Sequence, residues 1–111
     1  MPSPTPAQTA LDLLVLTVLS RRAPLHGYGI STAIEELSEE ALRIEEGSLY
    51  PALHRMEEAG WITAEWLISD TKRRVKFYSL SKEGRKQLEA ETADWKRLSR
   101  AISAIVLPAR S

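Results

Sequence analysis

One short segment of this chain combines a helical rhythm of apolar residues with side chains that form strong, directional hydrogen bonds. Residues 45–62 read EEGSLYPALHRMEEAGWI, and their apolar positions predict a helix with one side turned to a core. The other side carries Ser48, Tyr50, Pro51, His54 and Arg55. A guanidinium forms paired hydrogen bonds with a guanine edge or a phosphate, and a tyrosine hydroxyl can bond a phosphate. This side of the helix is therefore suited to contacts with base edges and phosphates.

The same residue types also have ordinary structural roles. A lone arginine such as Arg55 is most often a solvated surface charge, and Tyr50 can serve packing alone. A histidine such as His54 is more often a hydrogen-bonded surface residue than a reader of bases. The interpretation therefore depends on the whole set of residues and on the elements that position them.

Catalytic chemistry has much weaker support in this sequence. His26 and His54 fall on different predicted helices, and neither has an evident nucleophile or orienting acid near it in the sequence. The chain contains no glycine-rich phosphate loop and no cluster of metal ligands. The acidic pair Glu57 and Glu58 is best interpreted as a solvated helix face. We therefore expect no enzyme activity, no cofactor and no metal site.

Three helices are predicted in the first half of the chain. The first covers residues 7–22 and is apolar on more than one side. A turn at residues 26–29 opens the second helix, where two glycines permit unusual backbone geometry. Ser48 is the predicted N-cap of the third helix, which places Pro51 in its first turn and Gly60 at its end.

The hydrophobic period then changes from that of a helix to that of strands. Residues 62–68 alternate in polarity, and residues 75–80 are rich in β-branched and aromatic side chains, which predicts a β-hairpin. The tip and the start of the second strand carry the basic residues Lys72, Arg73, Arg74 and Lys76. A last helix is predicted from a cap at Ser81 to about residue 106.

This order of elements is that of a winged helix-turn-helix, followed by a long C-terminal helix. The predicted fold class is thus mainly α with a small β-hairpin, with a disordered tail at 1–7, a DNA-binding domain at 8–80 and a dimerisation helix at 81–107. In this motif the third helix lies in the major groove of DNA, and the wing touches the flanking backbone. The residues that we expect to contact DNA are Ser48, Tyr50, Pro51, His54, Arg55, Lys72, Arg73, Arg74 and Lys76.

Composition agrees with one domain and shows a strong charge asymmetry. The chain has 111 residues, no cysteine and a formal net charge of zero. Residues 1–71 hold 4 basic and 11 acidic residues, whereas residues 72–111 hold 11 basic and 4 acidic ones, so a neutral protein can still present a positive face. No apolar run approaches a membrane span, and the start does not have the pattern of a signal peptide. We expect a cytoplasmic protein without a membrane partner.

The last helix carries a stripe of apolar residues with the spacing of a coiled coil. The stripe consists of Leu88, Trp95, Leu98, Ile102 and Ile105, and it is interrupted where Glu91 takes a core position. A domain this small offers the stripe too few partners, so we expect a homodimer that also uses Leu11 and Leu14 of the first helix. Two copies of Trp95 near a two-fold axis could also hold a small planar aromatic effector, although interface packing is the simpler role.

Beyond these patterns, the sequence resembles the PadR-like transcriptional regulators. The matching residues are His26–Ile30, Gly47–Glu57, Gly60–Ile62, Arg73–Tyr78 and Leu80–Arg85. The resemblance spans roughly residues 8 to 107 and implies a winged helix, a C-terminal dimerisation helix and repression by operator binding. The chain resembles the short members of the family. Some proteins of the family respond to phenolic or drug-like molecules.

Two features depart from the family pattern. The turn of the wing often carries a glycine in the family, whereas Ser69, Asp70 and Thr71 stand here. Glu45 and Glu46 precede the third helix, where they suit the helix dipole and are expected to point away from DNA.

Two functions remain compatible with the sequence. The leading interpretation is a sequence-specific regulator of transcription, a repressor that binds a palindromic operator as a homodimer, and it agrees with the basic wing and the polar helix side. A winged helix used only for protein–protein contact is the alternative, because a fold alone does not determine a function. Strong salt dependence of duplex DNA binding would distinguish the first from the second.

Overall fold

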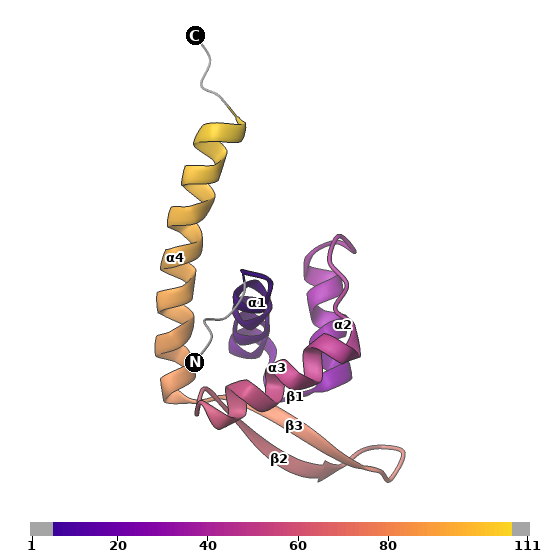
Figure 1. The fold of residues 1–111 in the computed structure, drawn as a ribbon. Helices are drawn as coiled ribbons and strands as arrows, with labels where there is room; N and C mark the ends of the chain where they lie inside the picture. Colours follow the sequence, from indigo (N-terminus) through magenta and orange to yellow (C-terminus); the bar gives the residue numbers. More distant parts are fainter. Residues whose placement is uncertain (1–5, 108–111) are drawn as a thin grey trace.

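The computed structural model describes residues 6–107 (Figure 1). Its elements are α1 (Pro6–Arg22), β1 (Leu25–His26), α2 (Gly27–Leu37), α3 (Glu46–Glu58), β2 (Ile62–Ile68), β3 (Arg74–Leu80) and α4 (Lys82–Val106). This order confirms the predicted fold class. Helix α1 begins at Pro6, one residue before the first predicted helix, and residues 1–5 of the predicted tail lie outside the described part.

The core forms where α1 passes between α4 and α2 (Figure 1). Its fully buried members come from all three N-terminal helices and from β2, and they include Val15, Leu16, Leu19, Ile30, Leu49, Leu53, Met56 and Ile62. Helix α1 is apolar on more than one side because it contacts α2, α3, α4 and β3 of its own chain. Leu11 and Leu14, which we predicted at a dimer interface, are half-buried and pack against this core.

Helix α3 begins earlier than its sequence suggested. Glu45 has an extended backbone and takes the N-cap position, and its carbonyl accepts hydrogen bonds from the backbone N–H groups of Ser48 and Leu49. Ser48 is therefore inside the helix and not its cap, and Pro51 lies beyond the first turn. Proline has no N–H, so the carbonyl of Gly47 cannot receive the usual helical hydrogen bond from residue 51.

The sheet has three strands, of which one was not predicted. Its order is β1-β3-β2, and both pairs of neighbouring strands are antiparallel. β2 pairs with β3 from Ile62 opposite Leu80 to Ile68 opposite Arg74, which confirms the predicted hairpin. Strand β1 is only two residues long, so it leaves no alternating pattern in the sequence.

Helix α4 is attached at its first turn and projects at its far end. The Ser81 side chain caps it as predicted, accepting from the Gly84 N–H at 3.0 Å and donating to the Gly60 carbonyl at 2.6 Å. A methyl group on Gly84 would overlap the backbone carbonyl of Trp61, so only glycine allows this close approach. The end of α4 extends beyond the three-helix core, and the molecule measures 61 × 32 × 24 Å (Figure 1). None of the described helices is long and apolar enough to cross a membrane.

Candidate nucleic-acid interface

One side of α3 is solvent-exposed along its whole length. Gly47, Tyr50, Pro51, His54 and Glu58 follow helical spacing and are all exposed, whereas the opposite side is buried in the core. We call these five residues the α3 stripe. The stripe contains no arginine, and its hydrogen-bonding groups are a phenol, an imidazole, a carboxylate and the Gly47 carbonyl.

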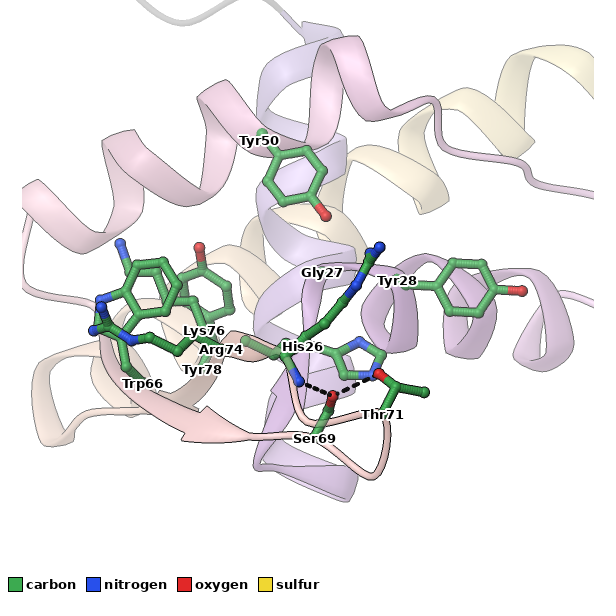
Figure 2. Close-up of a pocket in the computed structure, with 12 residues that line it drawn as sticks. His26, Gly27, Tyr28, Tyr50, Trp66, Ser69, Thr71, Arg74, Lys76 and Tyr78 are labelled. Carbon is green, nitrogen blue, oxygen red and sulfur yellow. Dashed lines mark hydrogen bonds between the residues drawn. The ribbon is translucent and has the colours of Figure 1, made fainter.

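Tyr50 is the largest exposed side chain of the α3 stripe, and it lies against the start of α2. A methyl group added to Gly27 would stand 2.6 Å from the Tyr50 hydroxyl oxygen and 2.8 Å from two ring carbons. Gly27 thus makes room for the phenol, and this contact explains why α2 begins with a glycine. The ring remains 46% exposed and points across the opening between α3 and the sheet (Figure 2).

Arg55 occupies a different place from the one that its sequence suggested. Its two terminal nitrogens donate to the carboxylate of Asp12 on α1, at 2.7 and 2.8 Å. The Asp12 side chain is only 5% exposed and the Arg55 side chain 40%. The hydrogen bond and charge of Asp12, together with the charge of Glu91, raise the pKa of Arg55 despite its partial burial. The guanidinium is therefore directed at α1 and not at the surface of the α3 stripe.

Three basic residues at the hairpin tip are free of carboxylate partners. Lys72, Arg73 and Arg74 are exposed, and no ion pair joins any of them to another residue of the described chain. We call these three residues the basic tip. A cluster of unpaired cations on a projecting turn is suited to contacts with phosphates.

The turn that carries the basic tip is closed by its own hydrogen bonds. The Ser69 N–H donates to the Arg73 carbonyl and the Lys72 N–H to the Ser69 carbonyl, both at 2.8 Å. Lys72 has a left-handed backbone, with φ of +61°. Lys72 thus takes the conformation that glycine adopts most easily, which explains how the turn closes without the glycine that is frequent in the family.

Lys76, also predicted to contact DNA, is engaged within the protein. Its ammonium donates to the Glu57 carboxylate on α3 at 2.8 Å, and this hydrogen bond raises the pKa of Lys76. The same ammonium lies 5.6 Å from the Tyr78 ring centre and 6.0 Å from that of Trp66, while Arg74 stacks over Trp66 at 5.0 Å. Lys76 therefore ties the sheet to α3, and the exposed Trp66 supports the base of the tip.

Tyr50 of the α3 stripe and several residues of the hairpin line an open groove of about 730 Å³ (Figure 2). Tyr50 enters it from α3, and Trp66, Arg73 and Arg74 line it from the hairpin. We did not predict that α2 contributes to this groove. The histidine, glycines and tyrosine at residues 26–29 were the feature of the sequence that could have indicated it. Tyr28 and His26 also line this groove.

The position of His26 follows from its role as the N-cap of α2. Its Nδ1 accepts a hydrogen bond from the Gly29 N–H at 2.9 Å, so in the neutral ring the proton is on Nε2. The ring also packs edge-on against Phe77, with ring centres 5.2 Å apart. The cap thus fixes the tautomer and orientation of a side chain that lines the groove.

His54 and Ser48 complete the set of residues that were predicted to contact DNA. His54 is exposed and pairs with Glu58 one turn later, at 2.8 Å between Nε2 and Oε1. Ser48 and Pro51 line a second, smaller hollow at the N-terminal ends of α1 and α3, together with Arg55. The nine predicted residues are therefore spread over two sides of α3 and the hairpin.

The apolar stripe of α4 is mostly uncovered within one chain. Leu88 packs against the core, whereas Trp95, Leu98, Ile102 and Ile105 are exposed. A hollow of about 290 Å³ between α1 and α4 is lined by Trp95, Leu98 and residues of α1.

Taken together, three helices, a β-hairpin with a basic tip and a projecting fourth helix define a winged helix-turn-helix protein with a long C-terminal helix. Residues 15–90 match the family described as the transcriptional regulator PadR-like family. Because the match covers more than half of its length, this chain belongs to the PadR-like family of transcriptional regulators.

Solved structures with similar folds agree with this assignment. A transcriptional regulator from Clostridium thermocellum is 28% identical, with a TM-score of 0.81 over 89% of this chain and 95% of that one. A PadR-like transcriptional regulator from Bacillus cereus is 26% identical, with a TM-score of 0.73 over 91% of this chain and 94% of that one. A PadR family transcription regulator from Clostridium difficile is 26% identical, with a TM-score of 0.72 over 86% of this chain and 97% of that one.

One longer relative is similar in sequence. An uncharacterized 37.1 kDa protein in a transposon of Streptomyces fradiae is 38% identical over 99 residues. The alignment covers 87% of this chain but only 26% of that protein. The chain thus spans about a quarter of the length of this relative.

Proposed function

We propose that this regulator binds double-stranded DNA in a sequence-specific manner, with α3 in the major groove and the basic tip on the flanking backbone. The observation that carries the proposal is an open groove lined by Tyr50 of the α3 stripe and by Arg73 and Arg74 of the basic tip. An α-helix fits the major groove of DNA, and a basic turn beside it reaches the phosphates. The two elements that border the groove thus match the two surfaces that a duplex presents.

The contacts divide by chemistry. Tyr50, His54 and the carbonyl of Gly47 are placed to form hydrogen bonds with base edges or phosphates, and Ser48 and Pro51 border them. Lys72, Arg73 and Arg74 supply the charge that attracts the backbone. Arg55 and Lys76 lie beside this surface with their charged groups engaged by carboxylates, so we assign them no direct contact.

We further propose that the protein acts as a homodimer on a palindromic operator and represses transcription in the cytoplasm. The exposed apolar stripe of α4 supports the dimer, because such a surface is stabilised when a second copy covers it. Two-fold symmetry of the protein then requires two half-sites, about one helical turn apart.

Selecting bound fragments from genomic DNA tests this proposal. We expect recovered fragments to share an inverted repeat, and affinity for them to fall steeply with salt, as counterion release requires. Transcription in vitro from a promoter that contains the repeat should decrease when the protein is added. Recovery of no common sequence, with no salt-dependent duplex binding, would contradict DNA binding and favour the protein–protein alternative.

The hollow beside Trp95 supports a second, smaller proposal. Trp95 and Leu98 offer an apolar surface beside the buried Glu91, and a planar aromatic effector would fit against the indole. Titration of tryptophan fluorescence with a panel of planar aromatics should show quenching that is lost in Trp95→Ala. If no compound quenches, or if quenching survives the substitution, Trp95 serves packing alone.

A further inference from the structure

A buried charge cluster connects the three helices that matter most for the proposed function. Asp12 on α1 lies almost completely buried, and both of its oxygens accept hydrogen bonds from Arg55 on α3. Two parallel bonds between a guanidinium and a carboxylate fix both the distance and the relative orientation of the groups. The residues are 43 positions apart, so the pair joins two elements and not two turns of one helix.

Helix α4 contributes the third member of the cluster. Glu91 is buried, and its Oε2 accepts from the Gln87 side chain at 2.8 Å. Its Oε1 has no hydrogen-bond partner in the described chain. The charge of Glu91 acts on Arg55, and the charges of both Asp12 and Arg55 act on Glu91, so the three side chains form one electrostatic unit. The helix predicted to form the dimer is thus coupled to the helix proposed to enter DNA.

The two charged contacts of α3 lie on either side of the α3 stripe. Glu57 binds Lys76 of β3, and Arg55 binds Asp12 of α1. Apolar packing of α3 fixes how deeply the helix is buried, but non-directional contacts resist rotation and sliding of a helix less well than paired hydrogen bonds do. The two ion pairs therefore add directional constraints on both sides of Tyr50 and His54 to those of the apolar packing.

We propose that Arg55 is a positioning residue, which acts on DNA recognition by fixing α3 to Asp12 rather than by touching a base or a phosphate. If Arg55 swung toward DNA, Asp12 would be left charged, buried and without its partner, which is a costly state. This inference rests on the proposed DNA-binding function and adds to it a specific mechanical role for a residue outside the contact surface.

Asp12→Asn distinguishes the two roles of Arg55, because Asp12 itself is buried and cannot contact DNA. If Arg55 positions α3, Asp12→Asn and Arg55→Gln should each weaken duplex binding by roughly 3- to 30-fold, the range for substitutions that act on a site without touching its ligand. The double variant should bind no more weakly than either single variant. If Arg55 instead contacts DNA, Asp12→Asn should bind as tightly as wild type or more tightly, because it frees the guanidinium, and this result would overturn the proposal.

Arg55→Lys gives a second, independent readout. Lysine keeps the positive charge but lacks the planar fork. A positioning role predicts that Arg55→Lys weakens binding as much as Arg55→Gln does. The loss of affinity should be the same for the original site and for sites with single base substitutions, and the salt slope should not change. Retained affinity in Arg55→Lys would point to a phosphate contact and overturn the proposal.

Two controls separate the possible failures. Circular dichroism and thermal unfolding identify any variant that does not fold, and Arg55→Lys is the more conservative test if Asp12→Asn unfolds. Wild-type protein that shows no salt-dependent duplex binding would refute the proposed function itself. Wild-type binding that Asp12→Asn leaves intact would refute only the positioning role.

Discussion

Tyr50 occupies its place because residue 27 has no side chain. The phenol fills the volume that a methyl group on Gly27 would take, and it meets the groove beside Tyr28 and His26. The first turn of α2 thus packs directly against Tyr50 of the α3 stripe, although 23 positions separate Gly27 from Tyr50 in the sequence.

Gly27→Ala should therefore disturb DNA binding without unfolding the protein. The new methyl group would push the ring of Tyr50, which is exposed and can move, so the cost to folding is small. We expect affinity for a selected duplex to fall by about 0.5–1.5 kcal/mol, the net worth of one hydrogen bond. Tyr50→Phe should cause a similar loss if the hydroxyl makes the contact.

Gly29→Ala is the matched control for Gly27→Ala. Its methyl group would lie 3.2 Å from the flexible Leu25 side chain and 3.4 Å from the His26 ring, and none of its three nearest atoms belongs to Tyr50. Equal affinity of the wild type and Gly27→Ala, measured by a fluorescence anisotropy titration, would show that Tyr50 does not contribute to recognition.

The sequence placed Tyr50 and His54 on the exposed side of α3, because helical periodicity alone determines which side is buried. It did not reveal the engagement of Arg55 or Lys76. Their partners, Asp12 and Glu57, lie 43 and 19 positions away, and only tertiary packing brings them together. Periodicity shows on which side of an element a charge lies, but not which charge it meets.

At the scale of elements, the wing separates into a structural base and a charged tip. The base is fixed by the pair of Lys76 and Glu57. The basic tip has no carboxylate partner in the described chain, and its residue Arg74 stacks on Trp66 at the junction with the base. The hairpin was predictable because residues 62–68 alternate in polarity and residues 75–80 are rich in β-branched and aromatic side chains. Strand β1 and the start of α3 were not, since a two-residue strand has no period and Glu45 takes the cap position without a side-chain cap hydrogen bond.

Neutralising the basic tip should weaken DNA binding for all sequences alike. We expect the triple variant Lys72→Gln, Arg73→Gln, Arg74→Gln to lower affinity for operator and random duplex together. The slope of log K against log salt should decrease by about 1 for each phosphate that the variant no longer neutralises. Titrations over a series of salt concentrations measure both quantities.

The first turn of α4 offers a control with the same change in charge. Lys82, Arg85 and Lys86 lie at the opposite end of β3 from the tip, and all three are exposed or partly exposed. Replacing them with glutamine should leave the salt slope nearer to that of the wild type. If both triple variants lower the slope equally, net charge and not the wing would govern binding.

The joint between α4 and α1 should give the fold a specific pH dependence. Burial raises the pKa of Glu91, and the charges of Asp12 and Asp94 raise it further, whereas the hydrogen bond from Gln87 and the charge of Arg55 oppose this effect. The folded state therefore binds this proton more tightly than the unfolded state does, because the pKa of Glu91 is raised on folding. The stability associated with that proton is present at low pH and is lost as the pH rises through the folded-state pKa.

Glu91→Gln should remove this loss, because glutamine stays neutral. We expect the melting temperature of Glu91→Gln, relative to wild type, to increase between pH 4 and pH 8. Glu89→Gln, two residues away and exposed, should show no such trend. A difference that is constant with pH, or that decreases as the pH rises, would contradict the raised pKa.

At the scale of the whole molecule, the projecting half of α4 exposes apolar side chains that a single chain does not bury. Its apolar side chains are about half exposed or more. They lie on one long helix, as their heptad spacing predicted. The sequence predicts this apolar surface but not what covers it. The same heptad spacing is expected whether the helix packs against a second copy or folds back on its own domain.

Replacing Leu98 and Ile102 with aspartate should prevent assembly. Both side chains are about half exposed in the single chain, so the charges are tolerated in a monomer but not in an apolar interface. We expect monomers or aggregates, together with loss of tight operator binding. Sedimentation equilibrium measures the change, and a well-folded wild-type monomer at micromolar concentration would rule out the dimer.

The proposed function requires that two copies of α3, held by α4 at a fixed separation, contact two half-sites on one face of a duplex. Titration of a selected operator, compared with the same operator lengthened by about five base pairs between its half-sites, tests this claim most directly. The insertion rotates one half-site by about half a turn, so a rigid dimer can no longer reach both. We predict two chains bound tightly per original duplex and loss of that tight binding after insertion. Unchanged affinity after the insertion, or one chain bound per operator, would contradict the account.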